Sequence, residues 1–186
     1  MRVITGSARG MKLATPEGMD VRPTTEKVKE SIFNIIQFDI PGARVLDLFA
    51  GSGQLGIEAL SRGASYCTFV DRSAYSLEFV KQNLEHTKLA TSGAVVKNED
   101  SLGFLRKSKD TFDIAFLDPP YRKQIINEVL PLLVPRMSDG GIIVCETARE
   151  EELPQEVEGF SIYRDYNYSK IKLTIYKKTE EEEEDA

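Results

Sequence analysis

The chain has 186 residues, a length that fits one domain with a sizeable hydrophobic core and leaves no room for two domains of ordinary size. Hydrophobic residues make up 41% and charged residues 29% of the sequence, and no segment approaches the roughly 20 consecutive apolar residues of a membrane helix. Because the N-terminus also lacks the apolar core of a signal peptide, we expect a cytoplasmic protein.

The formal net charge of −6 argues at first against a nucleic-acid partner, but the C-terminus accounts for it. The segment "EEEEEDA" at 180–186 carries six acids, and the rest of the chain holds 24 acids and 24 bases. A run of like charges is typical of a solvated, disordered tail, which we assign to residues 179–186. Residues 1–30 hold a local excess of bases, namely Arg2, Arg9, Lys12, Arg22, Lys27 and Lys29 against Glu17, Asp20, Glu26 and Glu30.

In chain order, the first predicted elements are a small β-hairpin over residues 2–16 and a helix over residues 24–38. Four apolar residues fall on the inward face of this helix, namely Val28, Ile32, Ile35 and Ile36. Pro23 precedes the helix, and Thr24 or Thr25 is the expected N-cap. Residues 1–40 therefore form an N-terminal hairpin and helix that we expect to pack on the core.

From Arg44 onward, short β-rich runs alternate with helical patterns. Strands are predicted at 44–49, 66–71, 93–98, 112–117 and 140–146, and helices at 53–63, 74–88, 101–108 and 124–134. Five strands with helical crossovers predict an α/β fold with a mostly parallel sheet covered on both faces. Two final β-rich runs, 159–168 and 170–178, are joined by a short polar turn, which predicts a hairpin and one antiparallel strand in the sheet. This main domain spans residues 41–178.

The cysteines offer little chemistry. Cys67 and Cys145 both sit in apolar strand-like runs, which is typical of inert buried thiols. The chain has one histidine, His86, and no closely spaced cysteine pair, so we expect no metal site.

Three glycines, Gly51, Gly53 and Gly56, have the G-x-G-x-x-G spacing at the first predicted turn from strand to helix. Glycines there permit a tight turn, close approach of a ligand and exposed N–H groups at a helix N-terminus. Asp71 ends the second strand 20 residues after Gly51, where a carboxylate can accept the hydroxyls of an adenosine ribose. Up to this point NAD fits as well as any other adenosine cofactor, and the glycines have a purely structural alternative, the packing of helix against strand.

Carboxylates recur where the predicted strands end: Asp47 precedes the glycine loop, and Asp71, Asp100 and Asp118 follow the next three strands. In an open α/β sheet these positions line the ligand crevice. A single acid there is often only a helix cap, but four in register favour a cation. S-adenosylmethionine, with its amino group and sulfonium, is such a cation, whereas a pyrophosphate is not.

The sequence "DPPY" at 118–121 follows the fourth strand. The N–H groups of an exocyclic nucleobase amine can donate to Asp118 and to the carbonyl of Pro119, which would aim the nitrogen lone pair at a sulfonium methyl group. Pro119 and Pro120 have a fixed φ and no N–H donor, so they present carbonyl groups rigidly, and Tyr121 can stack on the base. The alternative is a simple turn, which Asp-Pro pairs often open.

Over nearly its whole length the chain resembles the RsmD family of bacterial 16S ribosomal RNA guanine-N2 methyltransferases. The matching stretches are "RVITGSARGMKLATP", "VRPTTEKVKESIFNII", "VLDLFAGSGQLGIEALSRGA", "VDRS", "LDPPY" and "YSKIKLTIYKK". The resemblance implies a Rossmann-like class I methyltransferase fold with a seven-stranded sheet, and S-adenosylmethionine as cofactor. It also implies methylation of one guanine N2 in the head of the small ribosomal subunit, on an assembled or nearly assembled particle. We expect a monomer.

With this resemblance, the predicted site has three parts. The catalytic residues are Asp118, Pro119, Pro120 and Tyr121. The cofactor-binding residues are Asp47, Phe49, Gly51, Ser52, Gly53, Gly56, Asp71, Arg72, Ser73, Asp100 and Ser101. The RNA-binding residues are Arg2, Arg9, Lys12, Arg22, Thr24, Lys27, Arg122 and Lys123, through phosphate contacts that position the protein without reading sequence.

Two alternatives remain at this stage. The same chemistry would serve an enzyme that methylates adenine in DNA or another amine, although the chain has no room for a separate DNA-recognition domain. The other alternative is a non-catalytic ribosome-assembly factor that keeps the fold. The intact "DPPY" sequence argues against it, because a protein without catalysis has no chemical need for that group.

Overall fold

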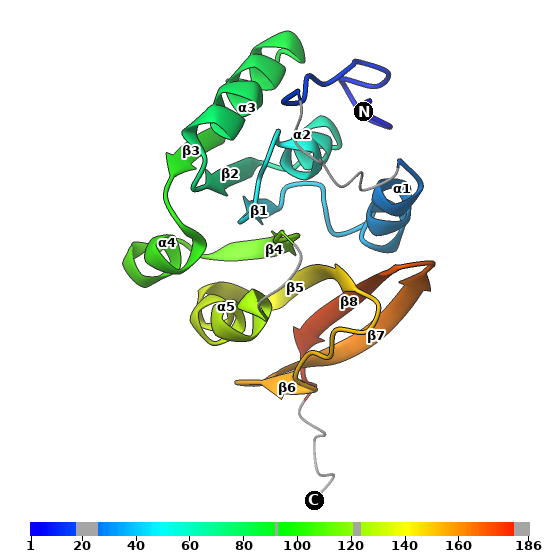
Figure 1. The fold of residues 1–186 in the computed structure, drawn as a ribbon, viewed down its shortest axis with the longest axis vertical. Helices are drawn as coiled ribbons and strands as arrows, with labels where there is room; N and C mark the ends of the chain where they lie inside the picture. The colour runs from blue at the N-terminus through cyan, green and yellow to red at the C-terminus, as the bar shows by residue number, and fades with distance from the viewer. Residues whose placement is uncertain (18–25, 92, 121–123, 181–186) are drawn as a thin grey trace, which may run out of the picture.

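The computed structural model describes residues 1–17, 26–91, 93–120 and 124–180, and shows one eight-stranded sheet with helices on both faces (Figure 1). The strand order is β3-β2-β1-β4-β5-β8-β7-β6. The strands are β1 (Arg44–Asp47), β2 (Tyr66–Asp71), β3 (Ala94–Asn98), β4 (Phe112–Leu117), β5 (Met137–Ala148), β6 (Glu156–Val157), β7 (Phe160–Tyr168) and β8 (Ile171–Lys178). The first five are parallel to one another, and β8 enters antiparallel between β5 and β7.

The predicted fold class is therefore confirmed, with one difference in detail. The sheet has an eighth strand, β6, which pairs with β7 through only Glu156 and Val157. A two-residue strand is too short to show any periodicity in the sequence, so it could not be predicted from the pattern.

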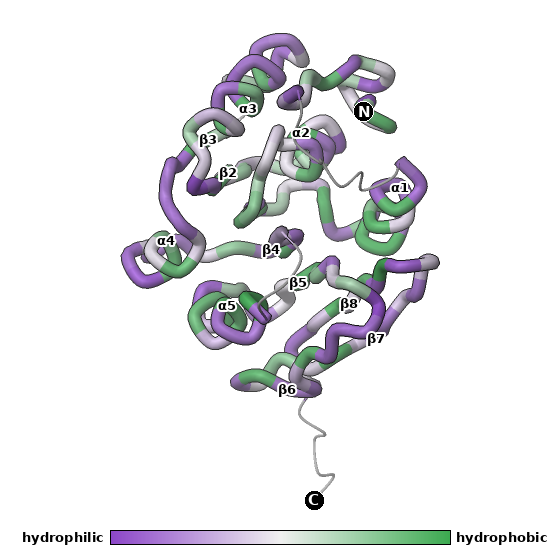
Figure 2. The backbone as a smooth tube through the Cα atoms, in the orientation of Figure 1, coloured by the Kyte–Doolittle hydropathy of each residue, from purple (hydrophilic) through white to green (hydrophobic). Residues whose placement is uncertain are grey.

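Five α-helices and one 3-10 turn pack on this sheet in the described part of the chain. They are α1 (Glu26–Ile35), α2 (Gln54–Ser61), α3 (Ala74–His86), α4 (Ser101–Lys107), α5 (Ile125–Leu133) and η1 (Val134–Arg136). Buried residues of α1, α2 and α3 form one core cluster with the N-terminal segment, and those of α4 and α5 form a second cluster. Two separate clusters are expected when helices cover both faces of a sheet. Figure 2 shows hydrophobic residues along the central strands, between these two layers.

The chain changes direction at β1. From β1 it winds outward to β2 and β3, and it then returns to the other side of β1 for β4 and β5. The connections after β1 and β4 therefore leave in opposite directions, which is the topology that provides a crevice at the carboxyl ends of two such strands. Open α/β sheets bind their ligands at such a switch point.

The N-terminal segment is less regular than predicted. Its hairpin consists of a single antiparallel bridge between Arg2 and Lys12, supported by a hydrogen bond from the Val3 N–H to the Met11 carbonyl at 3.0 Å. Helix α1 ends at Ile35; of the four residues predicted to face inward, Val28, Ile32 and Ile36, which follows the helix, are buried, and Ile35 is half-buried. Lys29, one of the six bases counted in residues 1–30, is completely buried by the fold and does not belong to the exposed bases.

Both cysteines are buried, and burial raises the pKa of the Cys67 thiol well above its ordinary value. These thiols are therefore protonated and shielded, as predicted. Within the described ranges, no helix combines the length and apolarity needed to cross a membrane, and no group of three or more His, Cys, Asp or Glu side chains could hold a metal ion.

Candidate active site

Three of the four predicted carboxylates end neighbouring strands at the switch point. Asp47 is the last residue of β1, Asp71 is the last residue of β2, and Asp118 directly follows β4. The backbone holds these ends together, because Leu48 N–H donates to the Phe116 carbonyl at 3.3 Å. Acids that follow or end three neighbouring strands thus lie together at the switch point, where the crevice of an open α/β sheet is expected.

Asp47 is the most buried of these acids, with 2% of its surface exposed. Its Oδ2 accepts a hydrogen bond from the Gly56 N–H at 3.0 Å. Removal from water raises the pKa of the Asp47 carboxyl to about 7; the Gly56 N–H opposes this rise, and the negative charges of Asp118 and Asp71 add to it. A cation in the crevice would offset the same repulsion, so the electrostatics favour a positively charged ligand.

The glycine loop does not present its N–H groups to a ligand, contrary to the expectation from the sequence. Each of the three has an acceptor inside the protein: Gly51 donates to Asp71 Oδ2 at 2.9 Å, Gly53 to the Ala50 carbonyl at 2.7 Å, and Gly56 to Asp47 Oδ2 at 3.0 Å. A pyrophosphate site needs such N–H groups for the ligand. These three glycine N–H groups are therefore not available to the phosphates of a dinucleotide.

The glycines are needed for two different reasons. Gly51 has φ +55°, and a Cβ there would meet no atom within 4 Å, so the backbone at this position borders open space. A Cβ on Gly56 would lie 2.3 Å from Cε1 of Phe69, so this glycine permits α2 to pack against β2. The structural alternative thus explains Gly56, whereas Gly51 lies where a ligand can approach.

Asp71 shapes the next turn. Its Oδ1 accepts the Ser73 N–H at 2.8 Å, and Ser73 Oγ accepts the Ser76 N–H at 3.1 Å as the N-cap of α3. Each carboxylate oxygen retains a second acceptor position, which ribose hydroxyls can use. Arg72 lies between them with an exposed side chain.

Asp100 has a local explanation. It is the N-cap of α4, and its Oδ1 accepts the Gly103 N–H at 2.9 Å. It follows β3, the outermost parallel strand, with β2 between β3 and the crevice beside β1. Ser101 is the first residue of α4. Their role in cofactor binding stays a prediction, and the helix cap accounts for the contact seen.

The glycine loop has a support that the sequence did not reveal. Phe49 is half-buried against the second core cluster, and the Ser52 carbonyl accepts a hydrogen bond from Asn83 Nδ2 at 3.0 Å. The same Asn83 side chain holds the backbone of Ala14, accepting its N–H at 2.7 Å and donating to its carbonyl at 2.9 Å. The signal for this role is a polar residue on the inward face of α3, next to the buried Leu84.

Asp118 and the first proline directly follow β4 at the switch point. Asp118 is half-buried, Pro119 is buried and Pro120 is exposed. Pro119 thus anchors the turn while the next residue reaches the surface. The predicted site residues Tyr121, Arg122, Lys123, Arg22 and Thr24 lie outside the described residues.

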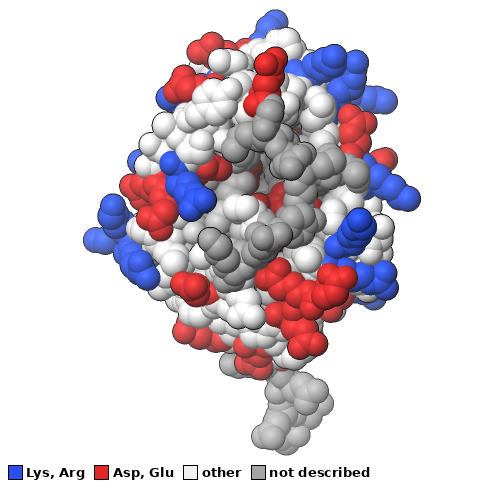
Figure 3. Space-filling view, in the orientation of Figure 1, with Lys and Arg blue, Asp and Glu red and all other residues white. Residues whose placement is uncertain are grey.

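The described RNA-binding candidates are all exposed. Arg2, Arg9 and Lys12 belong to the N-terminal segment, and Lys27 lies in the first turn of α1. Lys and Arg side chains gather over this region at the upper right of Figure 3. Arg2 Nη1 donates to the Gly10 carbonyl at 3.0 Å, which fixes this arginine across the loop.

Glu58 of α2 attaches this segment to the core. The buried carboxylate accepts the N–H groups of Ile4 at 2.9 Å and Thr5 at 3.0 Å. It also forms an ion pair with Lys29 at 3.0 Å and one with Arg62 at 2.9 Å. Burial lowers the pKa of Lys29 below its ordinary value, and the Glu58 charge partly restores it. The N-terminal segment is therefore part of the rigid core and holds its exposed bases in a fixed position.

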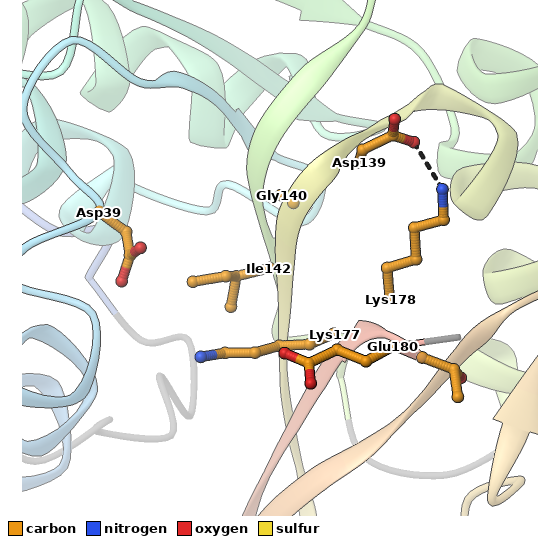
Figure 4. Close-up of a pocket in the computed structure, with 9 residues that line it drawn as sticks. Asp39, Asp139, Gly140, Ile142, Lys177, Lys178 and Glu180 are labelled. Carbon is orange, nitrogen blue, oxygen red and sulfur yellow. Dashed lines mark hydrogen bonds and ion pairs between the residues drawn. The ribbon is translucent and has the colours of Figure 1, made fainter. Parts of the chain in front are cut away.

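A separate cavity of about 280 Å³ lies away from the crevice, where β5 begins and β8 ends (Figure 4). At the edge of this cavity, Lys178 Nζ lies 2.8 Å from Asp139 Oδ1 and forms an ion pair with it. The hydrogen bond from Lys178 in this pair lowers the pKa of Asp139. Its lining residues are Asp39, Asp139, Gly140, Gly141, Ile142, Lys177, Lys178, Thr179 and Glu180. The cavity contains none of the predicted site residues and is distinct from the crevice.

Comparison with known proteins places the chain in a family. Residues 1–177 match the family model described as "Conserved hypothetical protein 95". The chain is 45% identical to "Putative rRNA methyltransferase YlbH" of Bacillus subtilis, with 96% of the chain and 99% of the relative covered. It is 35% identical to "Ribosomal RNA small subunit methyltransferase D" of Escherichia coli K12, with 100% and 94% covered.

Solved structures agree. The chain is similar to "Putative methyltransferase yhhF" from Escherichia coli, with a TM-score of 0.86, 33% identity, and 97% of this chain and 99% of that chain covered. Similarity to "hypothetical protein TTHA0928" of Thermus thermophilus has a TM-score of 0.82 at 27% identity, with 95% and 99% covered. The chain therefore belongs to the Conserved hypothetical protein 95 family, and its resemblance to the RsmD family is confirmed.

Proposed function

We propose that this protein transfers a methyl group from S-adenosylmethionine to the exocyclic N2 amine of one guanine in 16S ribosomal RNA. One observation carries the proposal most directly. Asp118 and Pro119 lie at the carboxyl end of β4, beside the buried Asp47 at the end of β1. This juxtaposition puts acceptors for an amine next to a crevice that favours a cation. The similarity to relatives named as ribosomal RNA methyltransferases supports the substrate class.

The residues present fit S-adenosylmethionine, which supplies a methyl group on a positively charged sulfur. Asp47 offers a carboxylate whose pKa is raised to about 7 by burial, with a smaller contribution from the negative charges of Asp118 and Asp71. Asp71 offers acceptor positions for a ribose, and Gly51 leaves the backbone open to close approach. The glycine amides are already bonded within the protein, which suits a cofactor without pyrophosphate.

The catalytic contribution of the chain is positioning. A guanine N2 amine is planar, and its lone pair is delocalised into the ring. Two acceptors, the Asp118 carboxylate and the Pro119 carbonyl, take its two N–H groups and turn the lone pair towards the methyl group. Tyr121 stacks on the flipped base in this proposal, as aromatic residues do in enzymes that act on extruded bases.

RNA engagement is assigned to residues 1–40, which form the N-terminal RNA-binding part beside the methyltransferase domain of residues 41–178. Arg2, Arg9, Lys12 and Lys27 are exposed there and can contact phosphates. Glu58 holds the N-terminal segment on α2, whose first turn follows the glycine loop. The expected substrate is the assembled or nearly assembled small subunit. We expect the protein to act on it as a monomer in the cytoplasm.

The proposal is tested by supplying methyl-labelled S-adenosylmethionine with small subunits from a strain that lacks this methylation. Parallel reactions contain naked 16S RNA and double-stranded DNA. We expect label in the subunits and much less in the other two substrates. Preferential labelling of DNA, or no labelling of any RNA, would contradict the proposed substrate.

A further inference from the structure

A row of aromatic and basic side chains lies on the β7–β8 hairpin, outside the residues assigned above. We call Tyr163, Arg164, Tyr166 and Lys177 the β7 ladder. The Arg164 guanidinium lies 6.0 Å from the centroid of the Tyr163 ring and 5.9 Å from that of Tyr166. Lys177 Nζ lies 4.1 Å from the centroid of Tyr163. Cations and rings thus alternate along one face of the hairpin.

A β-bulge produces this arrangement. The pairing of β7 with β8 shifts between Ile162 and Arg164, so Tyr163 is the extra residue. A bulge re-aims side chains, and here it brings two successive residues, Tyr163 and Arg164, to the face that carries Tyr166. Tyr163 is 58% exposed, so its ring surface is open to a partner.

No acidic side chain of β7 lies on the face that carries the ladder. Asp165 points to the other side of the sheet, where its Oδ1 accepts the Thr174 hydroxyl at 2.6 Å. Acids do gather at the lower right of Figure 3, and the segment that joins β5 to β6 carries three of them in 150–152. The exposed bases Arg149 and Lys170 lie beside the turn between β7 and β8, where Arg149 N–H donates to the Lys170 carbonyl at 2.9 Å.

The register of the sheet connects the ladder to the proposed reaction. Leu117 pairs with Cys145, Cys145 with Thr174, and Thr174 with Asp165, so Asp118 is level with Tyr166, the next residue of β7. Three strand spacings separate β4 from β7, which is about 14 Å at about 4.8 Å each. The Tyr166 end of the ladder therefore lies nearest to a base held at Asp118, and the Lys177 end lies further along the strands, towards the start of β5.

We propose that the β7 ladder is a second RNA-binding surface, on which unpaired bases that flank the target nucleotide stack. Stacked aromatic rings with interleaved Arg and Lys are the chemistry of platforms for single-stranded nucleic acid, since every base has a π-face and every nucleotide a phosphate. The inference rests on the proposed function for the identity of the RNA. It is independent of the N-terminal bases, which lie on a different element.

The test compares Tyr163→Ala, Tyr163→Phe and Arg164→Ala with Asn167→Ala. Asn167 is an exposed residue of the same strand that alternation places on the opposite face, so it is the matched control. Binding of a fluorescent, single-stranded RNA oligonucleotide is measured by anisotropy. KM and kcat are measured on small subunits, and the Kd of S-adenosylhomocysteine is measured by calorimetry.

We expect Tyr163→Ala and Arg164→Ala to raise the oligonucleotide Kd and the subunit KM by about 5- to 150-fold, the range of one lost stacking contact. The kcat and the cofactor Kd should stay unchanged. Tyr163→Phe keeps the ring and should bind like wild type, as should Asn167→Ala. The natural chain has no Trp, so Tyr163→Trp adds a single reporter whose fluorescence should be quenched by the oligonucleotide.

If Tyr163→Ala has the Kd and KM of the wild type, the proposal that the β7 ladder binds RNA is wrong. It is also wrong if Tyr163→Phe and Tyr163→Ala weaken oligonucleotide binding equally. Equal affinity of wild type for a duplex of the same sequence would also overturn it, because paired bases cannot stack on the rings. A wild-type protein that methylates no RNA would sink the proposed function instead. A selective loss of oligonucleotide binding in the variants would then still support the ladder.

Discussion

Replacing Asp47 by Asn should stabilise the free protein and weaken its binding of cofactor. The side chains have the same shape, and an Asn carbonyl can still accept the Gly56 N–H that Asp47 accepts at 3.0 Å. What the change removes is a buried negative charge beside Asp118 and Asp71. That charge is costly to the fold, and we expect it to be retained for a positively charged ligand.

The magnitude follows from the pKa of the Asp47 carboxyl, which rises from 3.8 to about 7 on folding. A raised carboxyl pKa stabilises the fold in its protonated form; this stability is fully present below pH 3.8 and is lost as the pH rises to about 7. About three pH units at about 1.4 kcal/mol each give about 4 kcal/mol. Above pH 7, Asp47→Asn should therefore be more stable than wild type by up to about 4 kcal/mol.

The assay is urea denaturation of the free protein between pH 5 and pH 8.5, with Asp110→Asn, a change at an exposed acid, as control. The free energy of unfolding of Asp47→Asn should exceed that of wild type by a margin that widens up to about pH 7 and then stays constant. The control should follow wild type. A margin that does not change with pH, or a less stable variant at pH 8, would refute this electrostatic account of Asp47.

Further predictions concern separate parts of the molecule. Asp118→Ala should lower kcat by at least about 100-fold and leave cofactor binding largely intact in calorimetry, because the main role of the lost acceptor is to position the amine. Arg9→Glu should raise the KM for subunits and flatten its dependence on salt, measured from about 50 to 200 mM salt. Gly56→Ala should lower the free energy of unfolding by about 1–3 kcal/mol in urea titrations, because the new Cβ meets Phe69 at 2.3 Å. Glu58→Gln should cost about 3–5 kcal/mol in the same titrations, since it leaves a buried lysine without its counter-charge. Normal turnover, salt response or stability in the respective variant would contradict each expectation.

The order of strands and helices could be predicted because each pattern reports burial. β2 and β4 are buried on both faces and consist of apolar runs, and α5 follows a helical period, although Pro131 lies inside it. The ends of β2 and β4 could be predicted from the same runs, and with them the positions of Asp71 and Asp118. Other bounds were less accurate, because β1 ends at Asp47 and not at Phe49, and β5 extends over Met137–Ala148 and not only over 140–146. These predictions use only residues that are close together in the chain, and such residues decide which strands and helices are buried.

Contacts between distant residues could not be predicted in this way. Lys29 resembles a surface base, because nothing near it in the chain reveals that it pairs with Glu58 in the core. Asn83 bonds to Ala14 and Ser52, and both partners lie far from it in sequence. Asp100 follows a strand as the other acids do, and only the strand order shows that β3 lies at the outer edge of the sheet; the role of Asp100 in cofactor binding stays a prediction.

The measurement that tests the central claim most directly is the identity of the modified nucleoside. Small subunits methylated by the wild-type protein are digested to nucleosides, and the products are separated and identified by mass spectrometry, with Asp118→Ala as the inactive control. We predict a single new product, N2-methylguanosine, that originates from one position of 16S RNA and is absent with the control. Methylation of another atom or base, or an equal yield from Asp118→Ala, would contradict the account.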